Sequence, residues 1–302
     1  MKRTLGFSVI IIFYNQREFV RTAMDSALGQ ADSGVEVIAV DDGSTDGTRD
    51  VLREYRDRAR VVLLRENRGA CAARNAGAEV ATGAYLAFLD GDDAFLPWAI
   101  DTYRRVAEEL TPALIMGPMR WFEGAVPEPG PSPERIRYVE YDDYFAKEQV
   151  IDISASAIVV RRRSLESIGG WEGFPVDDLD LLYRLGTAGP FVQITEPNTT
   201  WHRSHGGQVI RQTDQIIKGA EWLVANDRHG RYPGGDVRRM ERRACIGGIV
   251  LHWARMHARM GSRRHAFRFL LSNRPYVVAA VVTRVQRTIR GRKPHAEVVV
   301  GA

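Results

Sequence analysis

The sequence contains only two cysteines, Cys71 and Cys245, which lie far apart and outside any CxxC pair. This scarcity excludes a disulfide framework and a cysteine-based metal site. Both are predicted to be small core residues in a reducing compartment, so the cytoplasm is the expected location. With 44% hydrophobic and 26% charged residues in a chain of 302, one large or two modest folded domains are expected.

Long apolar runs are also missing. The run Phe7–Tyr14 follows Lys2 and Arg3, as in a signal peptide, but it is short and no cleavage pattern follows it. A buried first strand is therefore the better interpretation. The later apolar stretch Tyr276–Val282 is too short to span a bilayer.

Neither GxGxxG nor GxxxxGK[ST] occurs, which argues against a dinucleotide site and a P-loop. Instead, strand and helix patterns alternate. The expected strands are "FSVIIIFY", "VEVIAV", "RVVLL" and "AYLAFL", separated by the helical stretches "REFVRTAMDSALGQ", "RDVLREY" and "GACAARNAGAEVA". This alternation predicts an α/β fold with a mostly parallel central sheet flanked by helices.

Polar side chains follow three of these strands where each strand ends. Tyr14 and Asn15 follow the first, Asp41 and Asp42 the second, and Asp90–Asp93 the fourth. Open parallel sheets bind ligands at the carboxyl ends of their strands, so these groups are expected to line one crevice. The segment "GSTDG" after Asp42 is explained as a turn that starts a helix. Asp41 and Asp42 are not explained by that turn, and they could accept hydrogen bonds from a nucleobase or a ribose.

The segment "FLDGDD" predicts a cation site. Side chains two apart on a strand point the same way, so Asp90 and Asp92 can share a target, and Gly91 permits close approach. Few hard oxygen ligands suit Mg²⁺ or Mn²⁺, with water and substrate phosphates completing the coordination. The alternative is that these acids cap a helix beginning near Pro97.

The order of "SVIIIFYN", "VIAVDDGSTDGT", "NRGACAARNAGAEVATGAYLAFLDGDD" and "GGWEGFPVDDLDLLYRL" resembles the family-2 inverting glycosyltransferases of the GT-A fold, over about residues 6–208. The resemblance implies a nucleotide-diphosphate-sugar donor, most simply a UDP-sugar, and a divalent metal. It also implies an acceptor hydroxyl on a glycan, a lipid-linked acceptor or a small molecule, and direct displacement with inversion.

Site residues follow from the same resemblance. Asp178 matches the general base, with Asp177 in place of the usual glutamate, and Asp92 matches the metal ligand. His205, in "RSHGGQ", is placed near the metal or the diphosphate. The residues predicted for the nucleotide-sugar are Tyr14, Asn15, Asp42 at the uracil, Arg74, Asn75 and Asp90 near the ribose. The first strand departs from the family pattern, since Ile12-Phe13 stands where a proline is common.

Two domains are predicted. Residues 1–212 are expected to form the GT-A glycosyltransferase domain, with a nucleotide-binding half at 1–100 and an acceptor-side half at 101–212. Residues 213–302 show helical patterns and are expected to form a basic C-terminal helical extension.

Charge is distributed unevenly. Residues 238–293 carry fifteen Lys or Arg and one acid, a local charge of +14. Because the whole chain carries +4 and the last nine residues −1, residues 1–237 carry −9. A basic amphipathic helix suits an anionic membrane surface, which would place the protein peripherally at the inner face of the membrane. The alternative is a helix pair packed on the acidic body.

Two other functions are weighed. A basic segment is typical of nucleic-acid binders, but no zinc, RRM-like or helix-turn-helix signature accompanies it. A non-catalytic sugar-nucleotide-binding protein is disfavoured because the general base and the metal ligand are both present.

Three tryptophans could either stack on an acceptor sugar or pack in the fold, namely Trp121, Trp171 and Trp201. The Pro/Gly-rich segment Gly124–Arg135 is expected to be a surface loop or a lid.

Overall fold

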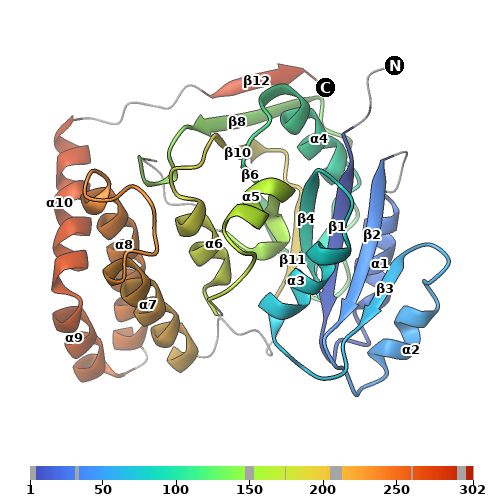
Figure 1. Cartoon of the computed structure of the whole chain (residues 1–302), viewed down its shortest axis with the longest axis horizontal. Coiled ribbons are helices and arrows are strands. Elements are labelled where there is room, and N and C mark those ends of the chain that lie inside the picture. The colour runs from blue at the N-terminus through green and yellow to red at the C-terminus, as the bar shows by residue number, and fades with distance from the viewer. Residues whose placement is uncertain are drawn as a thin grey trace.

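The computed structural model describes residues 5–30, 34–146, 153–173, 175–204, 213–259, 261–290 and 297–301. Its centre is a sheet with the strand order β12-β8-β10-β6-β9-β4-β1-β2-β3 (Figure 1). These strands are β1 (Phe7–Phe13), β2 (Val35–Asp41), β3 (Arg60–Leu63), β4 (Tyr85–Asp90), β6 (Leu114–Met116), β8 (Arg135–Tyr141), β9 (Ile158–Arg161), β10 (Phe191–Glu196) and β12 (Val298–Gly301). A smaller sheet contains β5 (Ala94–Phe95), β11 (Thr200–Arg203) and β7 (Met119–Phe122).

The helices follow the predicted alternation through the first half of the chain. They are α1 (Val20–Leu28), α2 (Thr48–Arg53), α3 (Ala70–Val80), α4 (Ala99–Leu110), α5 (Arg162–Ser167), α6 (Asp177–Leu185), α7 (Thr213–Arg228), α8 (Arg239–Arg259), α9 (Arg263–Ser272) and α10 (Arg274–Arg290). Short 3-10 helices occur at Tyr144–Ala146 and Ala155–Ala157. No helix or strand lies between Phe122 and Arg135, as the Pro/Gly-rich sequence predicts.

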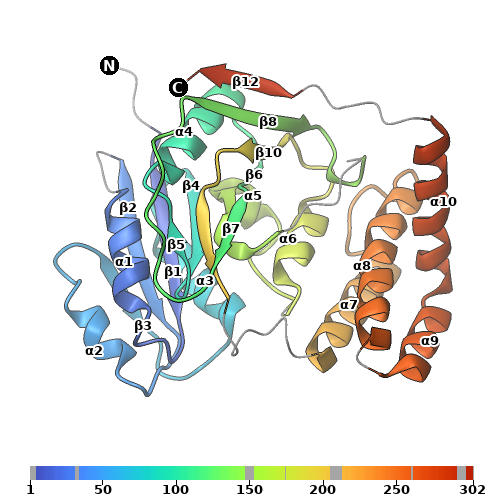
Figure 2. The same ribbon diagram turned by 180° about the vertical axis from the view of Figure 1, so that it is seen from behind.

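Strand β1 shows why the first strand is apolar throughout. Its side chains alternate between two cores: Ile10 and Ile12 pack in one, and Val9, Ile11 and Phe13 in the other. Helix α3 contributes to the first core, whereas α1 and α4 contribute to the second. Figures 1 and 2 show these helices on opposite faces of the sheet. Because both faces are covered, the strand has no water-facing side.

The prediction of a mostly parallel sheet is correct only for its first half. Strands β4, β1, β2 and β3 pair in parallel, and β6 pairs in parallel with β10. Strand β9, however, runs antiparallel to both β4 and β6, and β8 runs antiparallel to both β10 and β12. The sequence of residues 101–212 lacks regular alternation, so it gave no sign of these reversals.

The basic C-terminal helices pack against the body. Ile246 of α8 and Tyr276 of α10 lie in the same apolar core as Leu181 of α6. The expected all-helical extension also contains a strand, since β12 joins the edge of the central sheet beside β8. Over the described ranges, none of the helices is long and apolar enough to cross a membrane. The division at residue 212 stays a prediction.

Helix α3 lies so close to the sheet that Gly77 leaves no room for a side chain. A Cβ at Gly77 would lie 2.4 Å from Cγ2 of Ile10 and 3.2 Å from Cγ2 of Val40. Both neighbours are fully buried and cannot move aside cheaply. We therefore expect Gly77→Ala to lower the free energy of unfolding by about 1–3 kcal/mol, measured by urea denaturation.

The matched control is Gly248→Ala in α8, where a Cβ would meet nothing within 4 Å. Alanine has the higher helix propensity, so this change should raise the stability by about 0.5–1 kcal/mol. Equal effects of the two substitutions would contradict the proposed steric role of Gly77.

Candidate active site

The register of the sheet brings the polar strand ends together. Strand β1 lies between β4 and β2, with Phe13 beside Asp41 and Ile12 beside Asp90. The loops that follow β2 and β4 therefore lie on either side of the residues that follow β1. This confirms the expected gathering of the polar clusters along one edge of the sheet.

The adjacent acids after β2 have different partners. Asp41 is fully buried, and its Oδ2 accepts hydrogen bonds from Nε of Arg49 at 2.6 Å and from the Ser44 N–H at 3.1 Å. Asp42 is also buried, and its two oxygens accept the N–H groups of Arg68 and Gly69, each at 2.8 Å. Both acids thus hold loops, and a second role for Asp42 at the donor base stays a prediction.

Gly43 makes this arrangement possible. Its φ of +79° lies in the left-handed region, and a Cβ at this position would lie 2.4 Å from the backbone nitrogen of Asn67. The backbone after β2 therefore touches the backbone before α3 directly. This contact brings the N–H groups of Arg68 and Gly69 within reach of Asp42.

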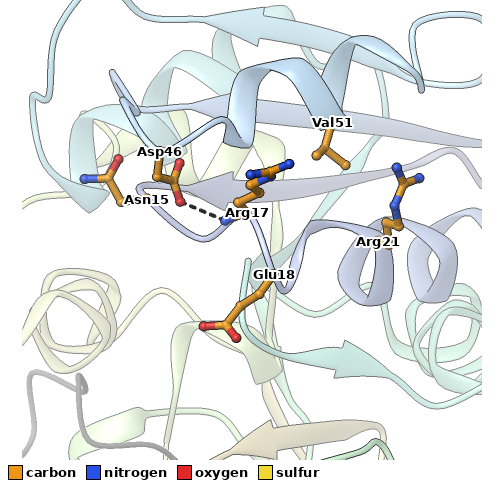
Figure 3. Close-up of a pocket in the computed structure, with 6 residues that line it drawn as sticks. All are labelled: Asn15, Arg17, Glu18, Arg21, Asp46 and Val51. Carbon is orange, nitrogen blue, oxygen red and sulfur yellow. Dashed lines mark hydrogen bonds between the residues drawn. The ribbon is translucent and has the colours of Figure 1, made fainter.

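Tyr14 and Asn15 follow β1. The Tyr14 ring is 46% exposed, which leaves a face free for contact with a ligand. The Asn15 side chain accepts the Thr45 N–H at 2.8 Å, so it ties the loop after β1 to the loop after β2. Asn15 also lines a pocket of about 530 Å³ with Arg17, Glu18, Arg21, Asp46 and Val51 (Figure 3). The acids predicted for the donor and metal do not line this pocket.

Arg74 is the centre of the predicted site. Its buried guanidinium lies 2.7 Å from Oδ1 of Asp90 and also bonds the carboxylate of Asp177. Burial lowers the pKa of Arg74, but the two carboxylates outweigh burial and hold that pKa above its ordinary value. A permanently charged arginine on α3 thus links β4 to α6. Asp90 and Asp177, which lie 87 positions apart in the sequence, both contact the guanidinium of Arg74.

Asn75 and Trp171 support Arg74. The Asn75 side chain donates to the Trp171 carbonyl at 3.0 Å and accepts the Trp171 N–H at 2.8 Å. The indole ring lies under Arg74, 4.8 Å from the guanidinium carbon. Trp171 is almost fully buried, so the hypothesis that it stacks on an acceptor sugar is wrong. Trp201 is buried as well, whereas Trp121 is half exposed.

Asp178, the predicted base, lies on the first turn of α6 next to Asp177. Burial raises its pKa to about 7, and the charge of Asp177 adds to this, while the Leu179 N–H and Arg74 act in the opposite direction. The charge of Asp90 also raises this pKa, which places the α6 acids and the acid at the end of β4 within electrostatic reach. A carboxyl with a pKa near 7 can accept and release protons at neutral pH.

The third acid of "DGDD" is structural. Asp93 is fully buried, accepts the Arg203 N–H at 2.9 Å and lies 2.7 Å from Nδ1 of His202. Burial lowers the pKa of His202, but the hydrogen bond and charge of Asp93, with Asp90 and Asp92 nearby, raise it above its ordinary value. Sequence reasoning missed His202, although it directly precedes the "RSHGGQ" element.

Arg203 fixes the loop that carries Asp92. Its Nε donates to the Asp92 carbonyl at 2.9 Å, and it also bonds the carbonyl of Gly124. Its guanidinium lies between the rings of Phe19 and Phe122, 4.7 Å and 4.5 Å from their centroids. These contacts of Arg203 hold the acid-rich loop in place.

The carboxylates in the loop after β4 suit a hard divalent cation. Asp90 and Asp92 are partly exposed carboxylates two positions apart, and oxygen ligands of this kind suit Mg²⁺ or Mn²⁺. Within the part of the chain that the structure describes, three or more His, Cys, Asp or Glu side chains do not converge on one point. Water and phosphate oxygens would have to complete the coordination. His205, the other predicted ligand, lies outside the described residues.

A family model places this chain among known proteins. The model for "Glycosyl transferase family 2" matches residues 8–169, more than half of the chain. The chain belongs to this family. The match spans β1 to the end of α5 and includes the strand-end acids after β2 and β4.

Curated relatives include TuaG of Bacillus subtilis, described as a "Putative teichuronic acid biosynthesis glycosyltransferase", 49% identical over 89 residues, which are 28% of this chain and 35% of TuaG. WfaP of Escherichia coli, a "UDP-Glc:alpha-D-GlcNAc-diphosphoundecaprenol beta-1,3-glucosyltransferase", is 28% identical over 67% of this chain and 78% of WfaP. The chain spans about a third of the length of TuaG and of two uncharacterised family members.

Solved structures share the fold. S. aureus TarS 1-349 in complex with UDP superimposes with a TM-score of 0.58 at 16% identity, over 82% of this chain and 71% of TarS. The mannosyltransferase PcManGT from Pyrobaculum calidifontis, in complex with GDP-Man and Mn²⁺, gives 0.58 at 16% identity, over 94% and 88%. The family-2 chain described here therefore has a GT-A type α/β fold with a helical C-terminal part.

In this family-2 chain, a second buried acid connects α6 to the C-terminal helices. Asp180 is fully buried two residues after Asp178. Its carboxylate accepts hydrogen bonds from Nε of Arg184 at 2.6 Å, Nε1 of Trp222 at 3.2 Å, Nδ2 of Asn226 at 3.1 Å and the Tyr232 hydroxyl at 2.8 Å. The helix that carries the predicted base is thus fixed to α7 and to the residues that follow it.

We expect Asp180→Ala to lower the free energy of unfolding by about 3–5 kcal/mol in urea denaturation, because it leaves the buried Arg184 without its closest carboxylate. The matched control is Asp236→Ala, which removes an 84% exposed partner of Arg239 and should cost under about 1 kcal/mol. If Asp180→Ala proved as mild as the control, Asp180 would not hold these helices together.

Proposed function

We propose that this chain is an inverting glycosyltransferase that moves a sugar from a nucleotide-diphosphate-sugar, most simply a UDP-sugar, to an acceptor hydroxyl. Family membership and the folds of TarS with UDP and PcManGT with GDP-Man support a nucleotide-sugar donor. WfaP, which is named for a diphosphoundecaprenol acceptor, supports a lipid-linked acceptor over a free glycan or a small molecule.

The observation that carries the proposal is the meeting of Asp90 and the α6 acids around Arg74. Asp90 ends the strand that leads into Asp92, and Asp177 directly precedes Asp178. This meeting supports a proposal in which a donor phosphate site and a proton acceptor come from opposite halves of the fold and act together. Direct displacement needs these two groups on either side of the anomeric carbon.

Asp178 is proposed to be the general base. Its raised pKa keeps the carboxylate basic enough to take a proton from the attacking hydroxyl, while a substantial fraction is ionised at neutral pH. Its neighbour Asp177 is engaged by Arg74 and Cys71, which leaves Asp178 as the α6 acid for proton transfer. One base suffices for a single inverting displacement.

The donor is proposed to bind along the ends of β1, β2 and β4. Tyr14 offers an exposed aromatic face. The carboxylates of Asp42 and Asp90 are proposed to accept hydrogen bonds from the nucleobase and the ribose in addition to those they accept within the chain. Asp92, with His205 as a further candidate, is proposed to hold Mg²⁺ or Mn²⁺ against the diphosphate. When bound, such a cation stabilises the negative charge that develops on the leaving diphosphate.

Replacing the proposed base should separate binding from chemistry. We expect Asp178→Asn to reduce sugar transfer by about 10²–10⁴-fold, because the proton acceptor is lost while the side-chain shape is kept. UDP and the UDP-sugar should raise the melting temperature of this variant as much as that of the wild type. Transfer is measured as nucleotide diphosphate release in a panel of UDP-, GDP- and other nucleotide-sugars.

The pH profile supplies the control for the Asp178 assignment. Since only the ionised carboxylate is a base, wild-type kcat/KM should rise from pH 6 and level off above the pKa of about 7. Asp177→Asn removes a negative neighbour and should lower the pKa of Asp178, moving this rise to lower pH. Wild-type turnover in Asp178→Asn would assign the general base to Asp177 or Asp180. In the melting experiment, failure of every nucleotide to stabilise the chain would overturn the proposed function.

Removing the proposed metal ligand should mimic removing the metal. We expect Asp92→Ala to lower transfer by about 10²–10³-fold, the cost of losing one group that stabilises charge on the leaving group. A chelator should lower wild-type activity to a similar level and leave the residual activity of the variant unchanged. The control is Asp101→Ala, an exposed acid on α4 paired with Arg105. Full wild-type activity in chelator would contradict a metal role.

A further inference from the structure

The outer surface of α9 and α10 is unusually apolar for a surface in contact with water. Seven large apolar side chains on these two helices are between 36% and 79% exposed. They are Phe267, Leu271, Val278, Val281, Val282, Val285 and Ile289, and they define what is called the α9–α10 face below. Clustered exposed apolar side chains on a folded protein mark a binding surface rather than ordinary surface composition.

Helical geometry places the α10 members of this face on one side. Val278, Val281, Val285 and Ile289 recur at intervals of three and four residues, which keeps them within one stripe. The opposite side of α10 is the one that packs, since Tyr276 and Ala279 are buried. At that contact, a Cβ on Gly247 of α8 would lie 2.0 Å from the Tyr276 carbonyl oxygen. The inner side of α10 therefore packs against α8, and the valine stripe is a separate apolar side of the same helix.

The charge on these helices has one sign. From residue 263 to residue 290 the sequence contains no acidic residue and seven arginines, namely Arg263, Arg264, Arg268, Arg274, Arg284, Arg287 and Arg290. The three on α9 at 263, 264 and 268 are exposed, and no described carboxylate forms an ion pair with them. By contrast, Arg231 and Arg238 pair with Glu172 and Asp143 of the body. Positive charge that no described carboxylate balances therefore lies on α9, the helix that carries Phe267 and Leu271 of the α9–α10 face.

A cavity of about 660 Å³ opens beside this face. Arg228, Arg243 and Arg274 line it together with the apolar side chains of Leu271 and Val278, which belong to the face. Figures 1 and 2 both place α9 and α10 at the end of the molecule opposite β2 and β3. The cavity and the stripe thus form one region of arginines and apolar side chains, away from the donor crevice.

We propose that the α9–α10 face docks on an anionic phospholipid bilayer. The valine stripe would enter the boundary between headgroups and acyl chains, while the arginines meet lipid phosphates. A nucleic acid would satisfy the arginines but leave the apolar stripe without a partner, and a second copy of the chain would bring like charges together. The surface lies outside the proposed donor site, so its test does not require sugar transfer.

The first experiment is flotation of the full chain with vesicles. The chain should bind phosphatidylglycerol vesicles and stay unbound with phosphatidylcholine vesicles, and added salt should weaken the binding. Equal binding to both vesicles, or to neither, would overturn the proposal. Release of the chain from vesicles by short DNA or RNA at matched phosphate concentration would instead assign the face to nucleic acid.

Variants test the stripe and the arginines separately. Val281→Glu and Val285→Glu should each weaken vesicle binding roughly tenfold or more, because they place a negative charge in the apolar stripe. Val237→Glu, at an 84% exposed valine outside the face, is the matched control and should bind as the wild type does. Arg264→Ser and Arg268→Ser should each cost about fivefold, or ~1 kcal/mol. Arg56→Ser, at an exposed position in the turn that follows α2, should cost nothing.

Two further measurements keep the test decisive. Thermal unfolding of Val285→Glu should match that of the wild type, since Val285 is half exposed and does not pack in the core. Analytical ultracentrifugation without lipid should show no concentration-dependent dimer. A wild-type dimer that Val285→Glu dissociates, together with unchanged vesicle binding in that variant, would reassign the face to a second copy of the chain.

Discussion

The candidate site depends on one buried guanidinium, that of Arg74. Asp90, Asp177 and Asp178 converge from two distant parts of the chain, and like charges brought together in a poorly solvated place repel strongly. Arg74 offsets this repulsion by pairing with two of the three carboxylates at once. Its planar guanidinium lies over the Trp171 ring, and Asn75 holds Trp171 through two backbone hydrogen bonds. A lysine could not make the same paired contacts.

The same arginine acts unequally on the two neighbouring acids at the start of α6. Asp177 is compensated directly, whereas Asp178 remains beside Asp177 and Asp90 with only partial relief from Arg74. Two neighbouring carboxylates on one helical turn thus differ in their surroundings: Asp177 is paired with Arg74, and Asp178 is the proposed general base. Replacing a buried ion pair by apolar residues is often neutral for stability, whereas removing only one partner is strongly destabilising.

Much of the first half of the fold could be predicted from the sequence. The continuous apolar strands and the helices between them appear where the pattern places them, because both faces of the sheet must be covered. The reversals at β9 and β8 could not be predicted, since short strands carry no sign of direction. Strand β12 was missed because "EVVVG" follows a long helical stretch and pairs with residues far away in sequence.

The gathering of acids near the ends of β2 and β4 could be predicted from the sequence, but the hydrogen bonds that each acid makes could not. Asp41, Asp42 and Asp93 look like their neighbours in sequence, yet each holds a loop through hydrogen bonds. That division depends on burial, which pairs of adjacent acids in the sequence do not reveal. The part of Trp171 as a platform for Arg74 depends on a contact across 97 positions. Short-range spacing does not encode such a contact.

Gly43 has a consequence for how this architecture can diversify. Next to Asp42, which is proposed to bind the nucleobase of the donor, two backbone segments are in direct contact, and Asp42 is bonded across their junction. Any side chain at Gly43 would push the two backbone segments apart and break the contact between them. It would do so without touching Arg74 or Asp178. Under the proposed function, differences in donor preference are therefore expected in the exposed residues around Tyr14 rather than in the backbone contact at Gly43.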